Sequence, residues 1–243
     1  MDLLNGKVGS LYFKYLSAAF GSALISSIYG IVDMAMVGQY QGPDGTAAMA
    51  VVAPIWNIIY SLGLLMGIGG SVIFSTKRGS GMSGDNEDNQ YFTAAVIGSV
   101  ILAALAWVGL ILFERPLLLF FGADETLLAL AQRYMIPVKV VFPLFLFNQM
   151  LAAFLRNDGA PALATLGVLS GGIFNVFGDY FFVFPCDMGI YGAGLATAAG
   201  SAVSFLVMLT HFASKKNTLR FVRPKQLARK LGKITVTGFS SFF

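Results

Sequence analysis

The sequence predicts an all-α, polytopic membrane helix bundle with six transmembrane helices and the start of a seventh. Three observations lead to this fold class. First, 56% of the 243 residues are apolar and only 12% are charged, whereas soluble domains carry about 25% charged residues. Second, six apolar stretches are each long enough to cross a bilayer, which takes about 20 residues. Third, basic residues flank these stretches mainly on one side.

Each predicted span is an apolar stretch bounded by connections rich in glycine, proline or charge. The first span carries Asp33 near its end, the second contains no charge, and the fourth is interrupted by Lys139 and Pro143. The fifth has no charge before Asp179. In chain order, the six spans are Tyr15–Gly38, Gly45–Thr76, Tyr91–Phe113, Tyr134–Leu155, Ala160–Phe184 and Tyr191–Ala213.

The distribution of Lys and Arg predicts the orientation of the bundle. Alternate connections on one side carry nearly all the basic residues, while the other side holds only Arg115 and Arg133. Because basic loops remain in the cytoplasm, we expect a multi-pass protein of the plasma (inner) membrane with both ends of the six-helix unit cytoplasmic. We interpret the net charge of +4 as this topology signal rather than as a sign of nucleic-acid binding.

Three segments are predicted along the chain. Residues 1–213 form the amino-terminal six-helix bundle, residues 214–233 form a basic cytoplasmic linker, and residues 234–243 resemble the first turns of a truncated second bundle. The linker holds eight of the sixteen basic residues, and we expect it to lie on anionic headgroups at the membrane interface. Since a second helical repeat is a common plan in transporters, we expect the sequence to be about half of a longer protein.

Polar residues on the first, fifth and sixth spans are predicted to form one buried site. Asn175 and Asp179 are four residues apart, so they share one face of an α-helix. Counted at 1.5 Å per residue from the predicted outer ends of their spans, Asp33, Asp179, Thr197 and Lys139 of the fourth span all lie about 7–9 Å deep. Because an aspartate side chain is too short to reach the headgroups as a lysine does, we favour a shared, wetted cavity over side chains that each point to the outer interface.

The residue types in this cavity indicate its chemistry. Two carboxylates buried close together cannot both ionise cheaply, so the pair is expected to exchange a proton for a cation. The neutral oxygens of Asn175 and Thr197 suit a hard ion such as Na⁺. We expect no cofactor and no other metal. Lys139 either pairs with a carboxylate, from which an incoming cation displaces it, or points to the outer interface. The residues that could also line the cavity are Tyr29, Lys139, Asn148 and Gln149.

The sequence also resembles a known family. IYGIVDMAMVGQY, followed by AAMAVVAPIWNIIYSLGLLMGIGGSVIFS, is similar to the opening of multidrug and toxic compound extrusion (MATE) transporters. FLRNDGAP, GGIFNVFGDYFFVF and GIYGAGLATAAGSAVS resemble the same family's run through its fourth to sixth helices, and the similarity covers nearly all of Gly6–Phe243.

This resemblance implies half of a twelve-helix fold made of two six-helix bundles. It implies the export of small organic cations against inward Na⁺ or H⁺. It also implies a cation site built from an acidic residue on the first helix, an N-x-x-x-D pair on the fifth and a hydroxyl on the sixth. Those roles fall on Asp33, Asn175, Asp179 and Thr197. Lys139 has no counterpart in the family's usual pattern.

The leading prediction is a secondary-active antiporter, or its amino-terminal half, that exports organic cations or drugs in exchange for Na⁺ or H⁺. Its expected partners are small organic cations, membrane lipid and a second six-helix bundle in cis or as a separate chain, and not nucleic acid. Two alternatives remain: a lipid-linked saccharide flippase, which would need several basic residues in the cavity, and a non-transporting fragment or subunit. An enzyme is not predicted, because Ser170 has no membrane-embedded histidine to act as its base.

Overall fold

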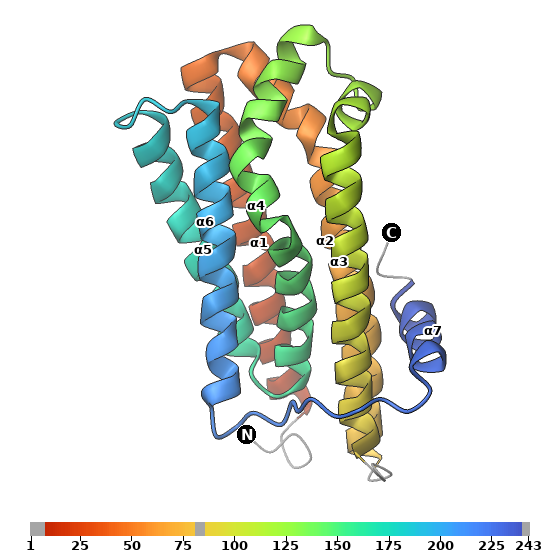
Figure 1. Ribbon diagram of the computed structural model, residues 1–243. Helices are drawn as coiled ribbons and strands as arrows, with labels where there is room; N and C mark the ends of the chain where they lie inside the picture. The colour runs from red at the N-terminus through yellow and green to blue at the C-terminus, as the bar shows by residue number, and fades with distance from the viewer. Residues whose placement is uncertain (1–7, 81–85, 240–243) are drawn as a thin grey trace.

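The computed structural model describes residues 8–80 and 86–239; within the first helix, several side chains lie outside the described part (Figure 1). This part of the chain is helical apart from its connections. The elements are α1 (Val8–Gln41), α2 (Pro43–Gly79), α3 (Glu87–Phe120), α4 (Glu125–Asn157), α5 (Pro161–Val183), α6 (Ile190–Leu209), the short 3-10 helix η2 (Thr210–Ala213) and α7 (Leu227–Gly238).

Helix α4 is the centre of the bundle, because it packs against α2, α3, α5 and α6. Helices α5 and α6 form a closely packed pair on one side, and α2 and α3 lie together on the other (Figure 1). Helix α1 packs against α2 and α5. The short helix α7 lies beside α2 and α3 at the lower end of the bundle as drawn in Figure 1. Polar groups on α1, α4, α5 and α6 can therefore meet inside the bundle.

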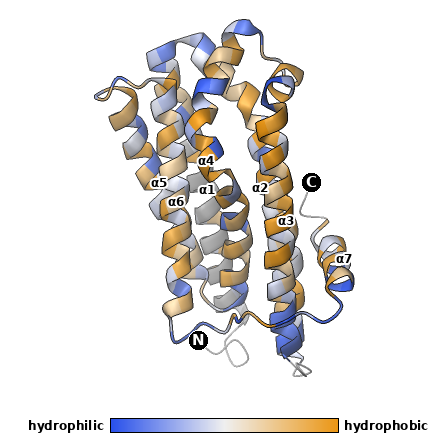
Figure 2. Cartoon of the chain, viewed as in Figure 1, coloured by the Kyte–Doolittle hydropathy of each residue, from blue (hydrophilic) through white to orange (hydrophobic). Residues whose placement is uncertain are grey.

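The helices are mainly hydrophobic along the length of the bundle, and hydrophilic residues gather toward its two ends (Figure 2). Large hydrophobic side chains such as Leu105, Leu112 and Phe177 are each more than 60% exposed, which is typical of a surface that faces lipid rather than water. Five helices in the described part, α2 to α6, are long and apolar enough to cross a membrane. The first predicted span, Tyr15–Gly38, falls in α1, part of whose side chains lie outside the described residues, and α1 is not among the five.

Short sequence signals separate the helices. Gly42, the residue between α1 and α2, has a φ of 73°, a backbone conformation that glycine adopts without steric cost. Pro43 and Pro161 occupy the first turns of α2 and α5, where a missing N–H costs nothing. The side chain of Asp124 caps α4 by accepting a hydrogen bond from the Leu127 N–H at 2.8 Å. These local signals determine where the long helices begin.

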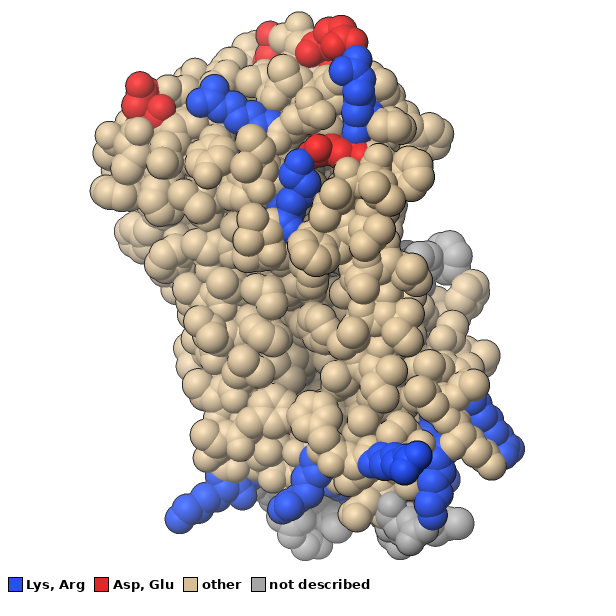
Figure 3. Space-filling view, in the orientation of Figure 1, with Lys and Arg blue, Asp and Glu red and all other residues tan. Residues whose placement is uncertain are grey.

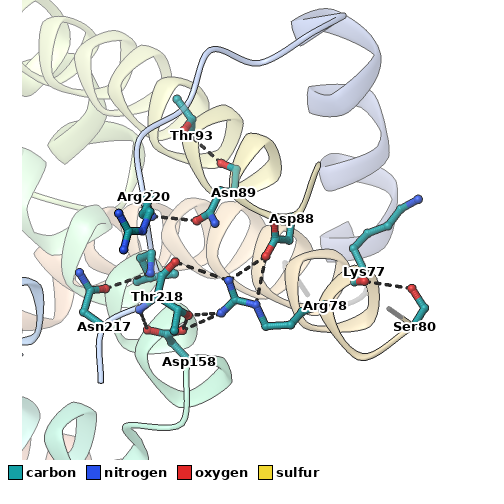
Figure 4. A network of polar contacts seen from close by, with 11 residues as sticks. Lys77, Arg78, Ser80, Asp88, Asn89, Thr93, Asp158, Asn217, Thr218 and Arg220 are labelled. Carbon is teal, nitrogen blue, oxygen red and sulfur yellow. Dashed lines mark hydrogen bonds and ion pairs between the residues drawn. The ribbon is translucent and has the colours of Figure 1, made fainter. Parts of the chain in front are cut away.

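Lys and Arg gather at the lower end of the molecule, which we call the basic end, while the upper end carries both acidic and basic side chains (Figure 3). At the basic end, a polar network joins α2, α3, α4 and the segment after η2 (Figure 4). Arg78 contacts Asp88 at 2.7 Å and Asp158 at 3.2 Å. Buried His211 lies 2.7 Å from the other oxygen of Asp158. Thr218 contacts both Arg78 and Asp158.

The segment between η2 and α7 is bonded to the bundle through its backbone. The N–H groups of Thr218, Arg220, Val222 and Lys225 donate to side-chain oxygens of Asp158, Asn89, Thr93 and Gln90 at 2.8–3.0 Å. Helix α7 begins at Leu227, inside the stretch 214–233 that the sequence predicts as a linker. It forms there because Lys230, Ile234 and Gly238, four residues apart, present one buried face to α2 and α3.

Candidate functional site: a buried acidic cluster

Four helices contribute polar side chains to one buried cluster. Thr197 of α6 lies at its middle. The Thr197 Oγ1 accepts hydrogen bonds from the Tyr134 hydroxyl and from Asn175 Nδ2, both at 3.2 Å. The Thr197 hydroxyl donates to Asp33 Oδ2 of α1 at 3.5 Å. On α5, Asn175 Nδ2 also donates to Asp179 Oδ1 at 3.4 Å. We call these five residues, Asp33, Tyr134, Asn175, Asp179 and Thr197, the acidic cluster.

Tyr134 of α4 completes the cluster. Its hydroxyl lies 3.4 Å from Asp33 Oδ2 as well as 3.2 Å from Thr197 Oγ1. A tyrosine hydroxyl carries one hydrogen, so it donates to either Asp33 or Thr197 at a given moment. A change in the charge of Asp33 can therefore redirect this hydrogen bond, which links α1, α4 and α6 through a single group.

The side chains of the cluster are buried, but several of their oxygen atoms lack a hydrogen-bond partner. Asp33 is 6% exposed, Asn175 3% and Asp179 0%. Asp33 Oδ1, Asp179 Oδ2 and Asn175 Oδ1 are buried without a hydrogen-bond partner in the described part of the chain. Leaving a buried acceptor unpaired costs about 1–3 kcal/mol, and more for a charged group. Three such oxygens in one cluster fit a positive ligand, either a proton on a carboxyl group or a hard cation that takes oxygen ligands.

Glycines on α5 and α6 bring the cluster together. A methyl group at Gly171 would lie 2.6 Å from the Gly200 carbonyl oxygen, and a methyl group at Gly200 would lie 2.6 Å from the Gly171 carbonyl oxygen. This close crossing places Asn175, one turn after Gly171, against Thr197, one turn before Gly200. Gly194 likewise allows α6 to contact the backbone of Tyr134. The glycines of α5 and α6 therefore position the cluster as well as the helices.

A small pocket with both polar and apolar walls opens beside the acidic cluster. It has a volume of about 60 Å³ and is lined in part by Asn175, Thr197, Asn148, Gln149 and Ser201. Asn148 Nδ2 donates to the carbonyl oxygen and the hydroxyl of Ser201 at 3.0 and 2.9 Å. A water molecule occupies about 30 Å³ in the liquid, so this pocket has room for water or a small ion rather than for a drug-sized molecule.

Of the other residues predicted to line the cavity, Asn148 and Gln149 line the pocket beside the cluster, whereas Lys139 does not. Lys139 Nζ lies 2.8 Å from Glu114 Oε2 of α3, so its charge is paired there rather than with Asp33 or Asp179. The backbone carbonyl of Lys139 accepts a hydrogen bond from Trp107 Nε1 at 2.7 Å, which fixes α4 to α3 on the same side. The side chain of Tyr29 lies outside the described residues.

Tyr134 is the member of the cluster that the sequence did not reveal. It stands at the start of the predicted fourth span, where a tyrosine is ordinarily read as an interfacial residue. In the structure α4 begins earlier, at Glu125, so Tyr134 lies more than two turns inside the helix and is 1% exposed. The nearest available signal was the apolar residues Leu127, Leu130 and Ala131, which precede Tyr134 at helical spacing and are compatible with a helix that begins before the predicted span.

In the described part of the chain, no group of three or more His, Cys, Asp or Glu side chains is arranged to hold a metal ion. The two carboxylates of the acidic cluster are supplemented by an amide and two hydroxyls, which are neutral ligands. This set differs from a transition-metal site, because the latter uses thiolate or imidazole groups.

The fold and the cluster together define a multi-pass helical membrane protein with a buried acidic site between its helices. Residues 18–181 match the MatE family, and the chain belongs to this family. MATE proteins are transporters and not enzymes, which agrees with the prediction from the sequence. The chain is 26% identical over 226 residues to the multidrug export protein MepA of Staphylococcus saprophyticus, covering 90% of this chain and 49% of that protein.

Solved structures show the same fold. A MATE crystal structure in the straight conformation superposes with a TM-score of 0.86 at 22% identity, covering 99% of this chain and 54% of that one. The Vibrio cholerae transporter VcmN in its bent form gives a TM-score of 0.83 at 21% identity, over 96% and 52% of the two chains. The chain therefore spans about half the length of the relatives it matches, and its helices form half of the MATE fold, as the sequence predicts.

Proposed function

We propose that this chain is the amino-terminal half of a secondary-active antiporter that exports organic cations or drugs across the plasma membrane in exchange for Na⁺ or H⁺. The observation that carries the proposal is the set of three unpaired buried oxygens, on Asp33, Asn175 and Asp179, around the shared Thr197 hydroxyl. Membership of the MatE family and the name of the MepA relative support the export of drugs.

In this proposal, the coupling cation or proton binds at the acidic cluster. The cluster joins α1, α5 and α6 and is linked through Tyr134 to α4. A ligand that neutralises Asp33 and Asp179 removes the repulsion between them and favours the arrangement in which these helices are close. Because a ligand shifts an equilibrium only by its differential affinity for the two states, the bound cation favours one arrangement of the bundle, and its release favours the other.

The flippase alternative receives less support than the antiporter. A cavity for a phosphate-bearing lipid would be expected to present several Lys or Arg side chains. The residues that line the pocket beside the cluster are polar, small or apolar, with no basic side chain among those described. Lys139, the one basic candidate from the sequence, is paired with Glu114. Cationic cargo is therefore the better proposal for this half of the protein.

The orientation and the segment boundaries belong to the same proposal. The concentration of Lys and Arg at one end supports a cytoplasmic basic end. Residues 1–213 would then be the first bundle, residues 214–233 the inter-bundle linker, and residues 234–243 the beginning of a second bundle that supplies the rest of the transport path.

The test is drug export by the protein as its gene encodes it, produced in a drug-sensitive strain. Asp33→Asn and Asp179→Asn should each abolish export of a fluorescent organic cation driven by a Na⁺ or H⁺ gradient, while the protein still inserts in the membrane. Asp44→Asn, at an exposed position in the first turn of α2, is the matched control and should export normally. Wild-type drug resistance in both cluster variants would refute the proposal.

A further inference from the structure

A second pocket lies at the basic end, between α7 and the ends of α2 and α3. Its volume is about 520 Å³, and its walls include Ile73 and Lys77 of α2 together with Arg229, Gly232, Lys233 and Val236 of α7. We call it the α2–α7 pocket. It is separate from the pocket beside the acidic cluster, since the two pockets share no lining residue. We propose that the α2–α7 pocket binds one anionic phospholipid, with the phosphate of its headgroup among Lys77, Arg229 and Lys233.

The electrostatics of the pocket favour a negative ligand. Glu87 lies 3.0 Å from Lys77 and 3.7 Å from Lys230, so one carboxylate is shared between two lysines. Arg229 and Lys233 are exposed on α7. The neighbouring carboxylates of Asp88 and Asp158 are engaged by Arg78 and do not neutralise the α7 side chains. The pocket therefore carries more positive than negative charge.

The positive charges around α7 repel one another, and the effect is seen at Lys230. Lys230 is buried against the bundle, with its ammonium group 4.2 Å from the centre of the Tyr91 ring. Burial lowers the pKa of Lys230; the charge of Glu87 opposes this, and the charges of Lys233 and Lys77 add to the lowering. A phosphate placed among Lys77, Arg229 and Lys233 would relieve this repulsion.

The apolar walls distinguish a lipid from a free anion. Ile73 forms part of the inner wall, and Val236, which is 79% exposed, forms part of the outer wall. Val72, next to Ile73 on α2, and Phe239, directly after α7, are also exposed and apolar. Basic side chains at the end of such a surface match a phospholipid, whose headgroup carries the charge and whose acyl chains need apolar contact.

Gly232 keeps the pocket open. A methyl group at Gly232 would meet no atom within 4 Å, and the backbone there is ordinary helix. A larger side chain can thus project into the pocket without moving the backbone, and leucine has a higher helix propensity than glycine. Gly232→Leu therefore tests the site by volume alone, while Arg229→Gln with Lys233→Gln tests it by charge.

The experiment measures lipid retention by native mass spectrometry on the protein as its gene encodes it, after exchange into detergent with phosphatidylglycerol, with phosphatidylcholine or with inorganic phosphate. The wild type should retain one phosphatidylglycerol and bind it more tightly than phosphatidylcholine. Since each basic residue near an anionic surface contributes about fivefold in affinity, the double charge variant should bind phosphatidylglycerol about 25-fold more weakly. Gly232→Leu, whose side chain projects into the pocket, should also retain less phosphatidylglycerol than the wild type.

Two controls match these variants. Lys215→Gln with Lys216→Gln removes the same charge from exposed positions outside the pocket, and Gly109→Leu adds the same side chain where α3 has open space. Both should bind like the wild type. Equal binding of phosphatidylcholine, competition by inorganic phosphate alone, or wild-type retention by Gly232→Leu would each overturn the proposal. Because drug export is not the readout, failure here is distinct from failure of the antiport proposal.

Discussion

Thr197→Val is the substitution that tests the acidic cluster most directly. Valine has nearly the same shape as threonine but lacks the hydroxyl. The change removes the two hydrogen bonds that Thr197 accepts at 3.2 Å and the one that it donates to Asp33 at 3.5 Å. A hydrogen bond contributes about 0.5–1.5 kcal/mol net, and these are long, so we expect a loss of about 2 kcal/mol in the free energy of unfolding. Thr197→Ser keeps the hydroxyl and should lose only about 0.8 kcal/mol for the missing methyl group.

The same substitution should weaken the response to the coupling ion. A ligand at one hundred times its dissociation constant stabilises a protein by about 2.7 kcal/mol. If the hydroxyl is one of the ligands and its loss weakens binding tenfold, that stabilisation falls to about 1.4 kcal/mol. The assay is thermal unfolding of the purified protein in NaCl, in choline chloride and across pH. A Thr197→Val variant with wild-type stability and a wild-type response to both Na⁺ and pH would refute the central role of this hydroxyl.

Two further predictions concern the surroundings of the cluster. Gly171→Leu should push α5 away from α6, because even a methyl group there would lie 2.6 Å from the Gly200 carbonyl oxygen. Overpacking of this kind costs about 1–3 kcal/mol, which is measurable as a lower unfolding temperature. The control Gly109→Leu should leave the unfolding temperature unchanged. Lys139→Gln should cost about 1–3 kcal/mol, because it leaves Glu114, whose side chain is 14% exposed, without its ion pair. It should leave the ion response intact, because Lys139 pairs with Glu114 rather than with the acidic cluster. If Lys139→Gln lost the ion response in the same unfolding assay, Lys139 would have to be part of the ion site, contrary to this prediction.

The acidic cluster and the α2–α7 pocket lie in different parts of the bundle. The cluster is buried among α1, α4, α5 and α6, whereas the pocket is open between α2, α3 and α7. The polar network around Arg78 and Asp158 holds the segment before α7 against the bundle. Helix α7 is thus attached to this half of the protein at its basic end, and a lipid bound in the pocket would add a contact between α2 and α7 from the membrane side.

The sequence by itself determined the membrane class, the helical architecture and the pairing of Asn175 with Asp179. These follow from local physics: an apolar stretch of about 20 residues has one stable arrangement in a bilayer, and residues four apart share a helix face. The approach of Asp33 and Thr197 to this pair was also predicted, from depth alone. Depth is set by helical rise, so it can be counted along the chain without knowledge of packing.

Tertiary structure alone decided which side chains meet at that depth. Lys139 was counted into the same layer as Asp33, yet it contacts Glu114 because it points toward α3. Tyr134 enters the cluster because Gly194 lets α6 reach its backbone, and the α2–α7 pocket exists because α7 packs on α2 and α3. Depth is a property of one helix, whereas the direction of a side chain toward a neighbour depends on how several helices rotate and pack, and residues far apart in the chain determine that packing.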